Sequence, residues 1–155
     1  LDGTPPVLKQ MVDTYDYYRC SVIGVQDVPR EDTKSYGIVD ARRVADRIEQ
    51  ISAIVEKPKP EEAPSTLAVV GRYILTPRLF HHLEHGKPGA GGEIQLTDGI
   101  AALLSEEQVL AYRYDGVRYD CGSKLGYLQA TVVFGQRHPE IGEAFSAYLK
   151  NSGVL

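Results

Sequence analysis

The chain has 155 residues, of which 43% are hydrophobic and 25% are charged. This composition is typical of a globular domain and excludes general disorder. The net charge of −4 argues against a nucleic-acid groove or a polybasic membrane patch. Two cysteines without a CxxC pair argue against a disulfide scaffold or a thiolate zinc site, and no apolar run approaches the length of a membrane span. The sequence therefore predicts one soluble, cytoplasmic domain over residues 1–155.

Helices and strands alternate along the chain. Helices are expected where apolar residues recur every three or four positions, and strands where short β-branched runs occur. In chain order we expect a helix over 5–18, a strand over 21–25, a polar loop over 30–35, strands over 36–39 and 48–55 separated by a charged turn over 42–47, a proline-rich loop over 57–64, a strand over 67–75, a helix from 77, a flexible glycine-rich segment over 86–92, a helix over 94–104, strands over 109–114 and 117–120, and helices from 124 and 139. Several strand pairs are hairpin-like, so the predicted fold class is α/β with a mixed sheet.

Three of the expected helices have a predicted inner face, and 123–151 forms a helical C-terminal segment. Thr76 is the expected N-cap of the helix from 77, and Ser123 that of the helix from 124. The expected inner faces consist of Leu79, Phe80 and Leu83; of Leu125, Leu128, Val132 and Val133; and of Ile141, Phe145, Tyr148 and Leu149. The run from Val132 to Phe134 is wider than one apolar stripe, which fits either a partner surface or ordinary core burial.

The sharpest local signal is an apolar strand that delivers Glu56 and Lys57 and then stops at Pro58. Neighbouring side chains on a strand point to opposite faces, so these two cannot both lie in the core. At the edge of a cleft, the carboxylate could accept hydrogen bonds from sugar hydroxyls and the ammonium could meet a phosphate. The alternative is a pair of solvated charges at a strand end.

A second signal is Asp120, placed at an expected strand end just before a helix. Ligand sites in open α/β sheets occupy this position, and a single carboxylate there suits Mg²⁺, which completes its shell with water and phosphates. The alternative is a turn aspartate that accepts a hydrogen bond from the backbone near Gly122. Cys121 lies beside it, but no histidine has a comparable position, which argues against a thiol nucleophile.

Three weaker patterns have structural explanations. The glycine-rich segment 86–92 lacks the order of a Walker loop, and a plain connection is its default interpretation. The histidines at 81, 82 and 85 have no HExxH carboxylate, which favours a solvated face over a metal site. Gly37 allows a ligand or another chain segment to approach closely, or marks a bulge.

The order of these blocks closely resembles the bacterial UTP–glucose-1-phosphate uridylyltransferases. The resemblance runs from Pro6 to about Leu149. The blocks that carry it are Lys34-Ser-Tyr-Gly-Ile-Val-Asp40, Ile54-Val-Glu-Lys-Pro58, Val69-Val-Gly-Arg-Tyr-Ile-Leu-Thr-Pro77, Gly91-Gly-Glu-Ile-Gln-Leu-Thr-Asp98 and Tyr119-Asp-Cys-Gly-Ser-Lys-Leu-Gly-Tyr127. It implies part of a Rossmann-like nucleotide-diphospho-sugar transferase fold with a mixed sheet and C-terminal helices.

The resemblance also implies a reaction and its residues. Glucose 1-phosphate and UTP would give UDP-glucose and pyrophosphate, with Mg²⁺ as the cofactor. Glu56 would bind glucose hydroxyls, Lys57 would meet the sugar phosphate and act as the catalytic residue, Gly37 and Val69 would line the sugar pocket through their backbones, and Asp120 would be the metal ligand.

The family's N-terminal glycine-rich loop and its following lysine occur nowhere in this sequence. By this resemblance the chain is the C-terminal portion of the enzyme, is inactive alone, and either forms a homo-oligomer or binds its own N-terminal half. Two alternatives are a sister NDP-sugar pyrophosphorylase and a non-catalytic fragment that serves in folding or oligomerisation.

Overall fold

The computed structural model describes residues 1–86, 88 and 92–153. The expectation of flexibility over 86–92 rests on positions 87 and 89–91, which lie outside the described residues. Contacts divide the chain into two compact units, Gly3–Gly116 and a smaller one formed by Leu1–Asp2 with Val117–Leu155. A single domain over 1–155 stays a prediction. In the part of the chain that is described, no helix is both long and apolar enough to cross a membrane.

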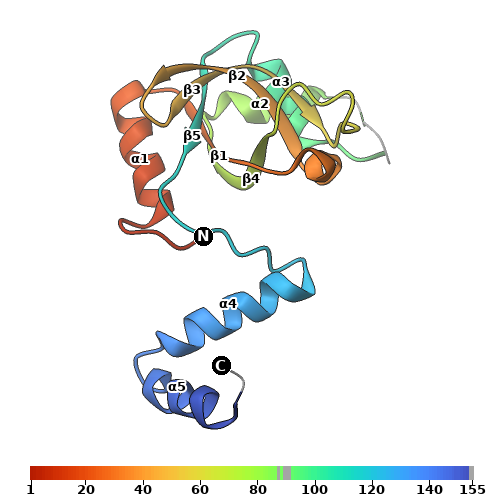
Figure 1. The fold of residues 1–155 in the computed structure, drawn as a ribbon. Helices are drawn as coiled ribbons and strands as arrows, with labels where there is room; N and C mark the ends of the chain where they lie inside the picture. Colours follow the sequence, from red (N-terminus) through yellow and green to blue (C-terminus); the bar gives the residue numbers. More distant parts are fainter. Residues whose placement is uncertain (87, 89–91, 154–155) are drawn as a thin grey trace. The chain divides into compact units, whose positions relative to one another are not determined.

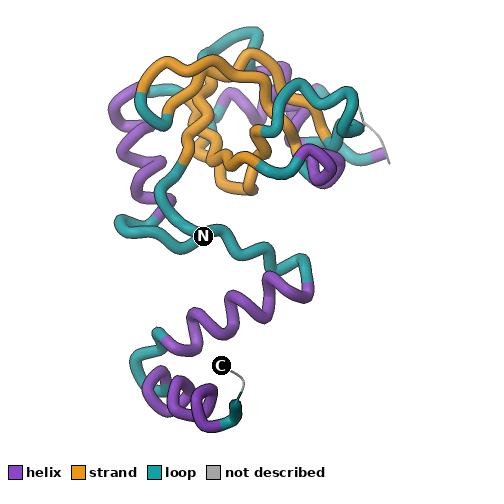
Figure 2. The backbone as a smooth tube through the Cα atoms, viewed as in Figure 1, coloured by secondary structure: helices purple, strands orange, loops and turns teal. Residues whose placement is uncertain are grey.

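The larger unit is a closed five-stranded barrel with helices packed on it (Figure 1). Its elements are α1 (Val7–Tyr18), β1 (Ser21–Asp27), the 3₁₀ helix η1 (Arg30–Ser35), β2 (Gly37–Ala45), β3 (Ile48–Glu56), β4 (Leu67–Ile74), α2 (Arg78–His85), α3 (Leu96–Leu103) and β5 (Val109–Arg113). The strands follow the order β1-β4-β2-β3-β5 around the barrel. They are the orange segments of Figure 2. The β1/β5 pair is parallel and the other pairs are antiparallel, so the prediction of a mixed sheet is confirmed.

The core of the barrel forms from apolar side chains on the strands, and β1 contributes them on both of its faces. Along β1, Ile23 and Val25 join a buried cluster that includes Ile100 and Leu103 of α3. Gly24 faces the other way, and a Cβ at this position would lie 3.4 Å from the Sδ atom of Met11 in α1. This close approach lets α1 pack against β1 and β4, while α3 packs against β3 and α2 packs against α3. The strand β1 is therefore buried on both faces, as its unbroken apolar run predicts.

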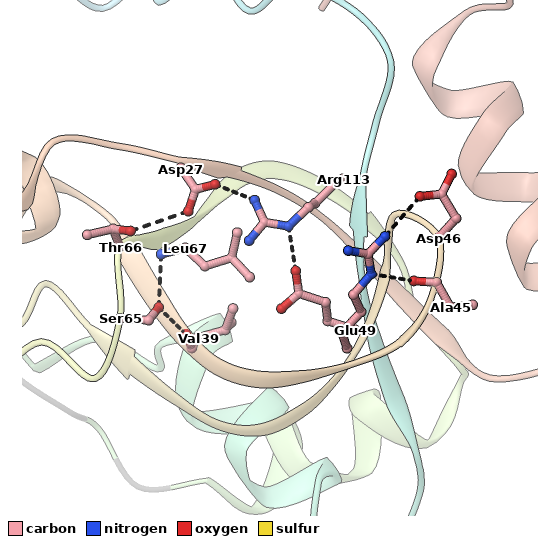
Figure 3. A network of polar contacts seen from close by, with 10 residues as sticks. Asp27, Val39, Ala45, Asp46, Glu49, Ser65, Thr66, Leu67 and Arg113 are labelled. Carbon is pink, nitrogen blue, oxygen red and sulfur yellow. Dashed lines mark hydrogen bonds and ion pairs between the residues drawn. The ribbon is translucent and has the colours of Figure 1, made fainter.

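A network of polar contacts ties the strands together at one end of the barrel (Figure 3). From β5, the guanidinium of Arg113 donates to Glu49 of β3 and to Asp27 at the end of β1. Asp27 also accepts a hydrogen bond from the hydroxyl of Thr66, at 3.3 Å. Ser65 donates to the carbonyl of Val39 in β2, at 2.6 Å. Burial opposes the charge of Arg113, but the hydrogen bonds that the guanidinium donates to Glu49 and Asp27, together with their negative charges, outweigh burial and raise the pKa of the guanidinium.

Two expectations for the larger unit are wrong, one in the type of element and one in its boundaries. The segment predicted as a polar loop is the 3₁₀ helix η1. Thr33 is buried there, and its hydroxyl donates to the carbonyl of Arg30 at 2.8 Å. The predicted charged turn over 42–47 is mostly strand. Arg42 and Arg43 belong to β2 and are exposed, so strand geometry costs their charges no desolvation. The turn itself occupies 46–47, with Arg47 at φ +57°.

The second expected helix also differs in detail. α2 begins at Arg78 after Pro77, and Thr76 does not cap it. The hydroxyl of Thr76 donates instead to the carboxylate of Glu107, at 2.7 Å. Leu79 is buried as expected, but Phe80 is exposed, because α2 contacts α3 along one narrow face.

The smaller unit contains α4 (Lys124–Gln136) and α5 (Gly142–Asn151), which pack on each other. The Ser123 N-cap is confirmed, since its Oγ accepts the N–H of Gly126 at 3.0 Å. The predicted strand over 117–120 is wrong: Val117 makes a single β-bridge to Asp2. Most of the predicted inner-face residues of these helices are not buried, because α4 and α5 cover only the part of each other's surface where they touch. Those exposed are Leu125, Leu128, Ile141 and Tyr148, whereas Leu149 is buried.

Arg113 of the polar network and the exposed Arg43 allow a matched test of stability. We expect Arg113→Met to lower the free energy of unfolding by about 1–3 kcal/mol, because the carboxylate of Glu49, only 14% exposed, loses its charged donor. Arg43→Met should change it by less than about 0.5 kcal/mol, because the Arg43–Asp46 pair is 73% and 85% exposed. Urea unfolding of the three proteins measures both values, and equal losses would contradict this assignment.

Candidate functional site

The candidate site lies where β2 begins and β3 ends. Gly37 and Glu56 are direct partners in the β2/β3 pairing. Partner residues on antiparallel strands project from the same face of the sheet, and Gly37 has no side chain to occupy that space. The carboxylate of Glu56 fills it: a Cβ on Gly37 would lie 3.3 Å from Glu56 Oε2. The glycine therefore leaves room for the carboxylate.

Four residues from four elements converge at this point. The position of the absent Gly37 Cβ lies 3.6 Å from Thr97 Cγ2 and 3.8 Å from Val69 Cγ2. The hydroxyl of Thr97 donates to Glu56 Oε2 at 2.6 Å. We refer to Gly37, Glu56, Val69 and Thr97 as the Glu56 cluster; it joins β2, β3, β4 and α3. The structure thus brings together three of the residues predicted from the sequence and adds Thr97.

Lys57 follows the cluster in an unusual backbone conformation. Its φ is +45°, in the left-handed region that few residues other than glycine adopt, although the next residue is a proline, which normally keeps its predecessor extended. The N–H of Lys57 is held by the carbonyl of Tyr36, at 3.0 Å. Strain of this kind is concentrated at functional sites, where surrounding contacts hold it in place.

The side chain of Lys57 is directed back toward the carboxylate. Its Nζ lies 3.8 Å from Glu56 Oε1, which is longer than a hydrogen bond. The Lys57 side chain is 62% exposed, so this ion pair is weak and does not hold the ammonium in place. The arrangement places one carboxylate and one exposed cation side by side, which suits a ligand that offers hydroxyls and a phosphate.

Tyr73 of β4 borders the same carboxylate. Burial raises the pKa of its phenol, and the negative charge of Glu56 raises it further. Neither Tyr73 nor Thr97 was identified from the sequence, because both are distant from Glu56 along the chain and belong to other elements. For each there was one usable signal: they lie inside two of the blocks that carry the family resemblance.

Asp120 belongs to the smaller unit, where it lies just before α4. Its Oδ1 accepts the N–H of Gly122 at 3.1 Å, and its Oδ2 accepts from Arg118 at 2.9 Å. Its backbone carbonyl accepts both the N–H and the hydroxyl of Ser123, each at 3.0 Å. Asp120 therefore shapes the turn that leads into α4, which is the hydrogen bonding expected of a turn aspartate. Its role as a metal ligand stays a prediction.

The donor set around Asp120 decides how a divalent ion could be held. Within 1–86, 88 and 92–153, no group of three or more His, Cys, Asp or Glu residues is placed to bind a metal. Mg²⁺ needs only one or two protein carboxylates when substrate phosphates and water complete its octahedron. Asp120 fits an ion of that kind, shared with a substrate, with Arg118 competing for the same carboxylate.

These features agree with the comparison to known families. The family model described as nucleotidyl transferase matches residues 6–151. The chain belongs to this family. The match covers both units, including the Glu56 cluster, Lys57 and Asp120.

Individual relatives confirm the resemblance to the UTP–glucose-1-phosphate uridylyltransferases. A UTP–glucose-1-phosphate uridylyltransferase from Pseudomonas aeruginosa is 51% identical over 125 residues, covering 81% of this chain and 45% of that protein. One from Staphylococcus epidermidis is 43% identical over 154 residues, covering 99% of this chain and 54% of that protein. A crystal structure of UDP-glucose pyrophosphorylase complexed with UDP-glucose aligns with a TM-score of 0.82 and 41% identity, covering 86% of this chain and 51% of that one.

These similarities confirm the predicted fold class, a mixed α/β nucleotidyltransferase fold with C-terminal helices. The chain spans about half the length of the relatives it matches.

The environment of Tyr73 gives a test of the geometry that needs no activity. In Glu56→Gln, the pKa of Tyr73 should fall toward its ordinary value but stay above it, because burial, the larger cause, is unchanged. Titration of ¹³Cζ-labelled tyrosines by NMR, assigned with Tyr73→Phe, measures this shift. Tyr112 is the internal control, since burial raises its pKa and Glu56 does not contribute. An unmoved Tyr73 would contradict the proximity of the two side chains.

Proposed function

We propose that the protein containing this chain transfers a uridylyl group from UTP to glucose 1-phosphate. An oxygen of the sugar phosphate attacks the α-phosphorus of UTP, a new P–O bond forms, and the bond to pyrophosphate breaks. Such a transfer depends on alignment and charge neutralisation more than on covalent help from side chains. The observation that carries this proposal is the convergence of Gly37, Glu56 and Val69 beside Lys57.

Each residue of this group has a distinct role in the proposal. Glu56 accepts hydrogen bonds from glucose hydroxyls, because an ionised carboxylate is a pure acceptor and hydroxyls are donors. Gly37 and Val69 line the sugar pocket through their backbones, and the absence of a Gly37 side chain leaves room beside them for the Glu56 carboxylate. Lys57 neutralises the sugar phosphate, and its weak pairing with Glu56 lets it move to an anion.

Asp120 is the residue proposed to hold Mg²⁺, together with water and substrate phosphates. When bound, the ion would neutralise phosphate charge during the transfer. The turn around Asp120 lies close against the first turn of α4, since a Cβ at Gly126 would lie 2.2 Å from the Asp120 carbonyl oxygen. This glycine lets the first turn of α4 close over Asp120.

The proposal extends to assembly and location. The nucleotide-binding loop expected for the family is not in this sequence, so residues 1–155 alone should be inactive. The exposed apolar side chains of α4 and α5 support packing against a second copy or against the N-terminal half of the enzyme. The cytoplasm is the proposed location.

Lys57 and Glu56 should fail in different ways. In the full-length enzyme, Lys57→Ala should lower kcat by about 100-fold, because it removes charge where phosphate charge concentrates. Glu56→Gln should mainly raise KM for glucose 1-phosphate. Pyrophosphate release from UTP measures both, with Lys59→Ala as the matched control, an exposed lysine that pairs with Glu62 outside the cluster. Normal turnover by Lys57→Ala would refute its role.

Asp120 is tested by its magnesium dependence. Asp120→Asn keeps an oxygen to accept the N–H of Gly122, so the turn should persist, while the negative charge is lost. The Mg²⁺ concentration for half-maximal activity should rise by about tenfold or more. Asp46→Asn, at the exposed hairpin turn, is the control. An unchanged magnesium titration in Asp120→Asn would return Asp120 to a purely structural role.

A further inference from the structure

The Glu56 carboxylate is held by a residue to which neither the sequence nor the family comparison assigned a role. The hydroxyl of Thr97 donates to Glu56 Oε2 at 2.6 Å. A hydrogen bond to an ionised acceptor is short and stronger than a neutral one. The other oxygen, Oε1, lies 3.8 Å from Lys57 Nζ. Each carboxylate oxygen therefore has its own neighbour, and rotating the carboxylate would exchange them.

The packing of α3 explains why Thr97 points at this carboxylate. Thr97 is in the first turn of α3, three residues before Ile100. Residues three apart share a helix face, and Ile100 is buried in the core cluster with strands of the barrel. The face that anchors α3 to the barrel thus carries Thr97 toward β3. The positive end of the α3 dipole also favours an anion beside its first turn.

Both branches of the threonine side chain are used. Its hydroxyl binds Glu56, and its methyl Cγ2 lies 3.6 Å from where a Gly37 Cβ would be. Because a β-branched side chain is stiff about χ1, fixing the methyl also fixes the direction of the hydroxyl. Valine would keep the methyl and lose the donor, whereas serine would keep the donor and lose the methyl.

We infer that Thr97 is a positioning residue that holds Glu56 in the orientation that binds sugar hydroxyls. This inference rests on the proposed function and deepens it. A glutamate has three rotatable bonds, and ordering such a side chain at a binding site costs free energy. The Thr97 hydrogen bond orders Glu56 before the sugar phosphate arrives, so its loss weakens sugar binding while the transfer step and UTP binding change little.

The test compares Thr97→Val with Thr97→Ser in the full-length enzyme. We expect Thr97→Val to raise KM for glucose 1-phosphate about tenfold, with kcat and KM for UTP within about twofold, and Thr97→Ser to restore most of the loss. Thr66→Val is the matched control, because the Thr66 hydroxyl also donates to a carboxylate, that of Asp27. If Thr97→Val does not fold, Thr97→Ala against Thr97→Ser gives the same comparison of one hydroxyl.

The outcomes separate this inference from the proposed function. An unchanged KM for glucose 1-phosphate in an active Thr97→Val enzyme overturns the inference alone, as does an equal loss in Thr97→Ser. A wild-type enzyme that forms no UDP-glucose overturns the proposed function. The inference is then decided by the crystal structure of Thr97→Val: displacement of the Glu56 carboxylate from Gly37 supports it, and an unmoved carboxylate refutes it.

Discussion

The register of the β2/β3 hairpin is the constraint on which the candidate site depends. The pairing skips Val44 on β2 and Ser52 on β3, so two irregularities on opposite strands compensate, and Gly37 still meets Glu56. Because side chains alternate with a period of two, a slip of one residue would turn Glu56 to the opposite face of the sheet. The hydroxyl of Ser52 bonds the carbonyl and the carboxylate of Asp40, at 3.0 and 2.9 Å, where its strand bulges.

The barrel makes this register useful because it surrounds Glu56 with other elements. Val69 arrives from β4, which pairs with β2 through Ile38 and Ala68, and Thr97 arrives from α3, which packs on β3. The Glu56 side chain is 33% exposed, so its charge is partly desolvated. Interactions with the few polar groups around it are therefore stronger than they would be at a fully open surface. The result is a carboxylate fixed on one side and open to a ligand on the other.

Sequence patterns predicted most of the elements because local physics governs them. Periodic apolar residues gave α1, an unbroken β-branched run gave β1, and Ser123 gave the N-cap of α4. Errors arose where tertiary contacts competed with local preference. The polar segment of η1 is ordered through buried Thr33, and Phe80 is exposed although its spacing is apolar. An apolar stripe predicts which face of a helix is suited to burial, but only the tertiary packing determines whether another element covers it.

For the site, the sequence by itself determined which chemistry is present: Glu56 and Lys57 at a strand end, a glycine at 37, and a carboxylate at 120 before a helix. Family resemblance then grouped these residues. Only the tertiary structure decided that Thr97 holds the Glu56 carboxylate and that Tyr73 lies close enough for the charge of Glu56 to raise its pKa. The physical reason is that these contacts join residues whose closeness is set by strand register and helix docking. Neither is encoded in a short stretch of sequence.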